Sequence, residues 1–318
     1  MSPPTEEVLQ AAFCWEADDQ IPRRPTMTAF RRQARYHQAH WREANQHPIG
    51  TQPIAPKPSD TRVRPVGSRL PLDYARDTGA NFLSSAALDA ARARTAYIEA
   101  RQSFDHQRLW ADLLSSAVLS FNLFGDLAAD LALADRAVHC WLPDTPGRVS
   151  ELRFAHSPGW FDPAYLNSLR SFDTVFILDL DDGARGIVAV DVKYHERSKP
   201  EIPRPENLDR YTKVAERSEA FVSGAIDTLK GRGDLCVLWL EHLLLFSMLQ
   251  HPTDNWTWGR YLVVHPTGNS DVVDLCSRYR NMLADETTFA TMTLEQLLDT
   301  AILPRPTTAA LRDRYLFE

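Results

Sequence analysis

Two apolar runs around a short turn constrain the fold of this chain more than any other feature. They lie in FDTVFILDLDDGARGIVAVDVKYHE, residues 172–196, on either side of an Asp-Gly pair. Such runs predict a β-hairpin of two buried strands, residues 175–180 and 187–192, around a turn at 181–185. Charged side chains are rarely buried without a partner, yet the outer ends of these runs carry Asp173, Asp191 and Lys193.

The hairpin register predicts that these charges meet. If the turn is centred near Asp182, Asp173 and Asp191 lie at equal distances from it, so their Cβ atoms should be ~5 Å apart across the strands. Lys193 follows Asp191 by two residues and therefore shares its strand face. Two opposed carboxylates repel each other, so Lys193 and a divalent cation would compensate them. A salt bridge at the sheet's end, with the second aspartate solvated, is the alternative that the pattern leaves open.

Oxygen ligands that converge from two strands suit Mg²⁺, and Mn²⁺ could take its place. Such a cation lowers the pKa of a bound water and stabilises charge on a phosphoryl oxygen. The pattern therefore indicates metal-assisted phosphodiester hydrolysis, with the lysine orienting the attacking water or helping to deprotonate it.

The remaining pattern predicts helices around these strands. Helical spacing of apolar residues covers residues 81–140, 206–229, 235–250, 270–283 and 293–301, and residues 149–156 and 259–266 resemble strands. This order is typical of an α/β or α+β fold. The most apolar segment, 235–250, is short for a membrane span and carries Glu241 and His242, so we expect a buried helix in which His242 is a core residue.

Charge is distributed unevenly along the chain. Residues 21–70 hold ten Lys or Arg and two acidic residues, although the whole chain carries a net charge of -7. A basic helix, residues 29–45, and an extended linker, residues 48–72, are expected there. This arm could bind a polyanion such as DNA or pair with the acidic body. The expected domains are an arm and linker over 1–75 and a globular domain over 76–318.

Several functional classes lack support in the sequence. The four cysteines form no CxxC pair, and the N-terminus MSPPTEEV lacks a signal peptide, so we expect a cytoplasmic protein without disulfides or a zinc ribbon. Neither a phosphate-binding glycine loop nor GxSxG is present. The arm histidines His37, His40 and His47 lack cysteine or carboxylate partners, so phosphate contact or exposure is expected for them.

An aspartate that opens one strand, followed by an Asp-x-Lys that closes the next, resembles the PD-(D/E)xK nuclease superfamily. The segments AFRRQARYHQAHWRE, HSPGWFDPAYL and GRYLVVHPTGN also look like a bacterial, PGN-type family of restriction-endonuclease-like proteins. The resemblance implies helices packed on a mixed central sheet and a Mg²⁺-dependent DNA endonuclease, of restriction or defence type. It carries over Asp173 and Asp191 as metal ligands and Lys193 as the catalytic lysine, and the Val192 carbonyl could add a further ligand. Restriction-type enzymes are often homodimers, so DNA and a second copy are the implied partners.

The chain departs from the family pattern at Ala155, Ala117 and Leu240, where the family carries Glu, Gln and Arg. If that glutamate completes the metal shell, Glu151 is the expected substitute, because it shares the strand face of Ala155. Two aspartates of the preceding helical segment are further candidates, Asp126 and Asp130. These departures suit an alternative function, a catalytically lapsed DNA-binding protein. A scaffold whose acidic body binds its own basic arm is a second alternative.

Overall fold

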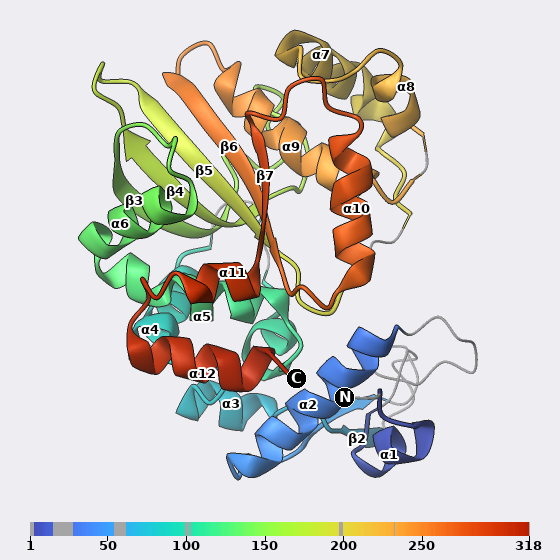
Figure 1. Ribbon diagram of the computed structural model, residues 1–318. Helices are drawn as coiled ribbons and strands as arrows, with labels where there is room; N and C mark the ends of the chain where they lie inside the picture. Colours follow the sequence, from blue (N-terminus) through green and yellow to red (C-terminus); the bar gives the residue numbers. More distant parts are fainter. Residues whose placement is uncertain are drawn as a thin grey trace.

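A five-stranded mixed sheet with helices on both faces forms the centre of the molecule (Figure 1). The computed structural model describes residues 3–14, 28–53, 62–98, 102, 104–196, 200–231 and 233–317. The sheet has the strand order β3-β4-β5-β6-β7. Its first three strands are antiparallel, and β6 and β7 continue it in parallel, which confirms the expected mixed sheet flanked by helices.

The strands of the central sheet are β3 (Arg148–His156), β4 (Phe172–Asp179), β5 (Arg185–Val192), β6 (Trp256–His265) and β7 (Phe289–Thr293). A separate antiparallel pair consists of β1 (Gly50–Pro53) and β2 (Val63–Val66). The helices are α1 (Glu6–Ala11), α2 (Ala29–Ala44), α3 (Leu72–Thr78), α4 (Ser85–Ala96), α5 (Ser116–Ala129), α6 (Leu131–Trp141), α7 (Leu208–Ser218), α8 (Ala225–Leu229), α9 (Cys236–Leu249), α10 (Ser270–Arg280), α11 (Leu294–Asp299) and α12 (Arg305–Tyr315).

The predicted hairpin is present as β4 and β5. Its register pairs Thr174 with Val190 and Asp179 with Arg185, as expected for a turn centred on Asp182. The Asp182 carboxylate accepts a hydrogen bond from the Ala184 N–H at 2.9 Å, and Gly183 has φ +79°, a conformation that suits glycine. Local turn chemistry therefore fixes the register that brings residues 173 and 191 to the same level.

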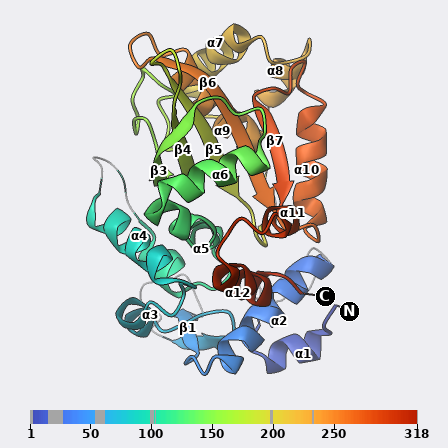
Figure 2. The same ribbon diagram turned by 60° about the vertical axis from the view of Figure 1, so that its left-hand side comes forward.

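The two faces of the sheet bury different sets of strand residues. Phe176, Leu178 and Val188 join the core beneath α5, α6 and α11, while Ile177 and Ile187 face α7, α9 and α10. Figure 2 shows α6 and α11 in front of the sheet and α9 behind it. Because both faces are covered, β4 and β5 read as continuous apolar runs rather than as alternating ones. Residues 173 and 191 belong by strand alternation to the α9 side.

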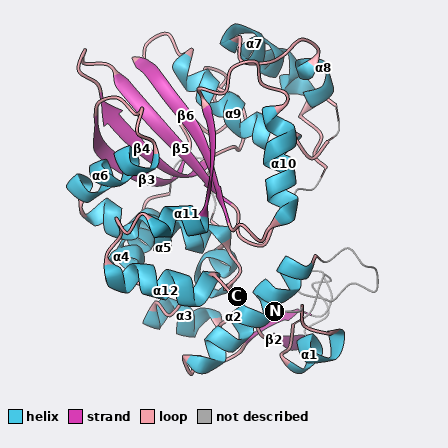
Figure 3. Cartoon of the chain, in the orientation of Figure 1, coloured by secondary structure: helices cyan, strands magenta, loops and turns pink. Residues whose placement is uncertain are grey.

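The basic helix α2 packs on the C-terminal helix α12, in the lower half of Figure 3. Gln38 Nε2 donates to the Tyr194 hydroxyl at 3.1 Å and to the Arg314 carbonyl at 2.6 Å. Arg314 is fully buried, donates from Nη1 to the Asn81 carbonyl at 2.7 Å, and lies 4.3 Å from the Trp41 ring centroid. Parts of the basic arm, residues 15–27 and 54–61, lie outside the described residues. The domain boundary near residue 75 stays a prediction.

Several elements differ from the sequence prediction. The helix expected over 206–229 is divided into α7 and α8, because Glu219 and Gly224 adopt positive φ values of 53° and 78°. The expected linker, residues 48–72, contains β1 and β2, and neither β7 nor α12 was predicted. None of the described helices reaches the length and apolarity needed to cross a bilayer.

Candidate active site

Asp173 and Asp191 meet at the end of β4 and β5. The two carboxyl groups lie within hydrogen-bond reach of each other. Asp173 Oδ2 also accepts the Val192 N–H at 2.8 Å, which ties the start of β4 to the end of β5. The register predicted from the turn is therefore confirmed where it matters, at the paired carboxyl groups.

Asp191 is held from two further directions. Lys193 Nζ lies 2.6 Å from Asp191 Oδ2, so the predicted trio forms one contiguous group. The hydroxyl of Tyr261, on the neighbouring strand β6, donates to the same oxygen at 3.1 Å. Tyr261 is fully buried and Asp191 is 7% exposed, so little solvent screens these contacts. Sequence reasoning placed residue 261 on a strand but missed its role.

Lys193 neutralises only part of the negative charge of Asp173 and Asp191. Burial and the nearby Asp191 raise the pKa of Asp173 well above its ordinary value, and Lys193 opposes that rise. Burial lowers the pKa of Lys193, but the Asp191 and Asp173 carboxylates outweigh burial and raise it overall. The lysine is therefore a fixed ammonium, and the aspartate pair favours a proton or a cation between its members.

A second charged group lies beside the pair and was not predicted from the sequence. Glu241, on α9, is buried and pairs through Oε1 with Arg170 Nη1 at 3.1 Å. Burial raises the pKa of Glu241 to about 7; Arg170 opposes this rise, and Asp191 adds to it. Arg170 also contacts Glu201 at 2.5 Å. The only sequence signal was an acidic residue within an otherwise apolar helix.

The donor set of the pair suits a hard divalent cation. Carboxylate oxygens from adjacent strands are the ligands that Mg²⁺ prefers, and Mg²⁺ usually completes its shell with water and substrate oxygens. Within the described part of the chain, no group of three or more His, Cys, Asp or Glu is arranged to hold a metal. Asp173 and Asp191 would therefore be the two side-chain ligands, with most of the shell left to water and substrate.

Glu151 does not join this pair. It lies opposite Ile177 in the sheet, whereas Ala155 lies at the level of Asp173, about 13 Å further along β3. Its carboxylate is bound by Arg153 at 2.6 and 2.7 Å, and this hydrogen bonding lowers its pKa. The expected substitution for a family glutamate therefore fails geometrically, because Glu151 and Ala155 share a face but not a position.

The other candidates have structural partners. Asp126 accepts a hydrogen bond from the Thr307 hydroxyl, and Asp130 caps α6 by accepting the Leu133 N–H at 3.0 Å. His242 is fully buried between Tyr279 and Thr288, as expected for a core histidine. The three arm histidines and His195 contact nearby groups: His37 the Asp313 carbonyl, His40 the Glu43 carboxylate, His47 the Tyr74 hydroxyl and His195 the Leu114 carbonyl.

Three of the arginines of α2 contact other parts of the protein or are buried. Arg31 Nε donates to the His195 carbonyl at 3.1 Å, and Arg42 donates to the carbonyls of Gly67 and His47 at 2.9 and 2.8 Å. Arg35 is only 3% exposed. Of the two expectations for this helix, the described contacts favour docking on the body.

Comparison with known proteins agrees with this geometry. The family model described as the PD-(D/E)XK nuclease superfamily matches residues 25–317, a range that contains α2, the whole sheet and the candidate site. The chain has no significant match among curated proteins or among solved structures. The sheet topology, the charged trio and the extent of the family match agree, and the chain belongs to the PD-(D/E)XK nuclease superfamily.

Proposed function

We propose that this chain is a metal-dependent deoxyribonuclease that hydrolyses DNA phosphodiester bonds at Asp173, Asp191 and Lys193. The observation that carries the proposal is the contact between two paired carboxyl groups, one of them buried, and an ammonium at the end of the sheet. Membership of a nuclease superfamily whose members generally use divalent metals supports it. Endonucleolytic cutting, a restriction or defence role, the PGN-type subfamily and a homodimer are finer proposals that follow from the sequence resemblance.

The proposed roles follow from the contacts. Asp173 and Asp191 would hold Mg²⁺, or Mn²⁺ in its place, with the Val192 carbonyl as a further ligand. A bound divalent cation lowers the pKa of a water and offsets charge on the scissile phosphate. Tyr261 fixes the orientation of Asp191 through its hydrogen bond to Oδ2. Such a fixed carboxylate loses little freedom when it takes up its ligand.

Lys193 acts as a positioned cation in this proposal. Its ammonium, held by Asp191, can donate hydrogen bonds to the attacking water or to a non-bridging oxygen of the phosphate. Because two carboxylates keep it protonated, it is a better donor than a base. The proton released by the water would then leave through bulk solvent or through the phosphate itself.

One observation favours a second candidate function, a catalytically lapsed DNA-binding protein. Ala155 occupies the level of Asp173 on the adjacent strand and has no carboxylate to offer. The described residues supply only two carboxylates in place of a larger ligand set. Weak cation binding would leave a nuclease fold that binds DNA without cutting it.

Plasmid cleavage in Mg²⁺, in Mn²⁺ and in EDTA tests the proposal. Asp191→Asn and Lys193→Met should each reduce the cleavage rate at least about 100-fold. The exposed α7 residues Asp209 and Lys213 provide matched controls, Asp209→Asn and Lys213→Met, which should cut like the wild type.

DNA binding separates the alternatives if the wild type does not cut. Salt-dependent affinity, measured by fluorescence anisotropy, would identify the lapsed protein. The absence of any DNA affinity would instead favour the scaffold, in which the acidic body binds its own basic arm.

A further inference from the structure

Arg108 extends from a fixed turn to the segment that follows Lys193. It belongs to a short π-helical turn, Gln107–Ala111, a rare conformation that is frequent at functional sites. The backbone of the turn is held in place, because Asp105 Oδ1 accepts the Arg108 N–H at 2.9 Å and the next three residues are buried. The guanidinium therefore starts from a well-defined position.

The contacts of the Arg108 side chain are weak and leave donors for a ligand. Its Nη2 donates to the Ser116 hydroxyl at 3.1 Å. The same nitrogen lies 3.4 Å from Glu196 Oε1, further than the about 2.7–2.9 Å of a strong charge-assisted hydrogen bond. Its Nε and Nη1 make no hydrogen bond to the described residues. The side chain is 51% exposed, and exposed ion pairs of this kind contribute little to stability.

Glu196 connects Arg108 to the candidate active site. Its Oε2 accepts the Tyr194 N–H at 2.8 Å, so the carboxylate folds back onto the residue immediately after Lys193. The Glu196 carboxylate also interacts electrostatically with both Arg108 and Lys193. A DNA strand whose scissile phosphate contacts Lys193 would therefore have a neighbouring phosphate close to Arg108.

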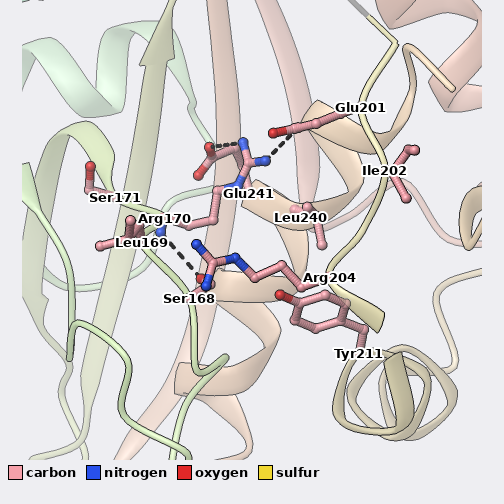
Figure 4. Close-up of a pocket in the computed structure, with 10 residues that line it drawn as sticks. All are labelled: Ser168, Leu169, Arg170, Ser171, Glu201, Ile202, Arg204, Tyr211, Leu240 and Glu241. Carbon is pink, nitrogen blue, oxygen red and sulfur yellow. Dashed lines mark hydrogen bonds and ion pairs between the residues drawn. The ribbon is translucent and has the colours of Figure 1, made fainter. Parts of the chain in front are cut away.

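A second arginine near the aspartate pair is already neutralised. Figure 4 shows the Arg170 guanidinium between the carboxylates of Glu241 and Glu201, at 3.1 and 2.5 Å, in the wall of a polar pocket of about 380 Å³. Its side chain is only 19% exposed. Two carboxylates at such distances leave no net positive charge for a phosphate. The cation that remains available to the DNA backbone is therefore Arg108, with one distant carboxylate.

We propose that Arg108 binds a backbone phosphate of the DNA next to the one at Lys193, in place of its weak contact with Glu196. The location beside the scissile phosphate rests on the proposed function, whereas the binding of a phosphate does not. Arginine suits this role, because its planar guanidinium presents several N–H donors to phosphate oxygens. Such a contact positions the strand and carries no information about base sequence.

DNA affinity in EDTA tests this contact without any cleavage. It is measured by fluorescence anisotropy between about 50 and about 200 mM salt, because each neutralised phosphate steepens the fall of log K with log salt by about 0.9. Arg108→Gln should reduce this slope by about 0.9 and lower the affinity at about 0.1 M salt roughly tenfold. The loss should be equal on duplexes of unrelated sequence. Arg108→Lys keeps the positive charge and should retain the slope.

Glu196→Gln separates a phosphate contact from a structural role. The glutamine can still accept the Tyr194 N–H, but it no longer competes for the guanidinium of Arg108. This variant should therefore bind DNA more tightly than the wild type, by up to about fivefold. If Arg108 acted only by holding Glu196, Arg108→Gln and Glu196→Gln would weaken binding alike and leave the salt slope unchanged.

An exposed arginine of α6 provides the matched control. Arg136 donates to the Ala132 carbonyl of its own helix, and Arg136→Gln should change neither the affinity nor the slope. A wild-type slope in Arg108→Gln, weaker binding by Glu196→Gln, or a wild type without DNA affinity would overturn the proposal. A wild type that does not cut in Mg²⁺, together with the expected loss of slope in Arg108→Gln, would count against the proposed nuclease alone.

Discussion

Replacing Asp173 by asparagine should stabilise the protein while it removes the cation site. Asparagine has nearly the same shape, and its carbonyl oxygen can still accept the Val192 N–H. Two unit charges about 4 Å apart repel by about 4 kcal/mol at an effective dielectric constant near 20. Lys193 cancels part of this repulsion, so Asp173→Asn should raise the free energy of unfolding by about 1–2 kcal/mol in EDTA.

The increase in the free energy of unfolding caused by Asp173→Asn should depend on pH. The pKa of Asp173 is raised in the folded protein, so above the ordinary value near 3.8 the folded chain retains a proton that the unfolded chain has lost. The contribution of protonated Asp173 to the free energy of unfolding is therefore complete at low pH and is lost as pH rises through the folded-state pKa. The variant lacks the group, so its advantage over the wild type should increase as pH rises from the ordinary value near 3.8 through the raised pKa of Asp173 in the folded protein.

Urea unfolding, followed by tryptophan fluorescence in EDTA and in Mg²⁺, provides the measurement. Mg²⁺ should stabilise the wild type and leave Asp173→Asn unchanged, because a ligand that binds only the folded state adds to its stability. Asp179→Asn, at the exposed far end of the same strand, is the control and should respond to Mg²⁺ like the wild type. A variant that is less stable than the wild type in EDTA at alkaline pH would refute the repulsion between Asp173 and Asp191.

Three further substitutions test the surroundings of the pair and of the core. Tyr261→Phe removes the donor to Asp191 Oδ2, so Mg²⁺ affinity by titration calorimetry should fall about tenfold, and an unchanged affinity would contradict the role given to the hydroxyl. Burial lowers the pKa of His242 to about 3, so below about pH 6.5 the unfolded chain gains a proton that the folded chain refuses. Wild-type stability should fall there by about 1.4 kcal/mol per pH unit from this residue, and His242→Gln should show a correspondingly shallower decline. Arg314→Met removes the buried guanidinium that donates to both the carbonyl and the side-chain oxygen of Asn81 and should cost about 3 kcal/mol in urea unfolding, whereas a cost near zero would show that these contacts are dispensable.

The part of the site that the sequence could predict depends on local geometry. An Asp-Gly turn and strand alternation suffice to place residues 173, 191 and 193 together, because each is counted from the same hairpin. The buried strands of the sheet could also be predicted, because long runs of β-branched residues are typical of strands. These arguments require only the position of one turn and no information about tertiary packing.

The rest of the site depends on tertiary contacts that no periodicity contains. Arg170 and Glu241 are 71 residues apart, on a loop and on α9. They meet because α9 belongs to the crossover connection between the parallel strands β5 and β6 and packs on one face of the sheet. Glu151 shows the opposite limit: period two gave its face correctly and left its position along the strand unconstrained. The strand β7 is five residues long and the helix α12 is largely polar, so neither has a strong pattern of its own.

The packing of α2 against α12 has a consequence for the order in which parts of the site form during translation. The hydroxyl of Tyr194, immediately after Lys193, accepts a hydrogen bond from Gln38 on α2, and its ring packs against Tyr315 on α12. Both helices therefore support the segment that follows β5. On a ribosome, the acidic pair emerges more than a hundred residues before that support can close. A chain that stops before α12 should therefore contain Asp173, Asp191 and Lys193 but lack one of the two supports of the segment that follows β5.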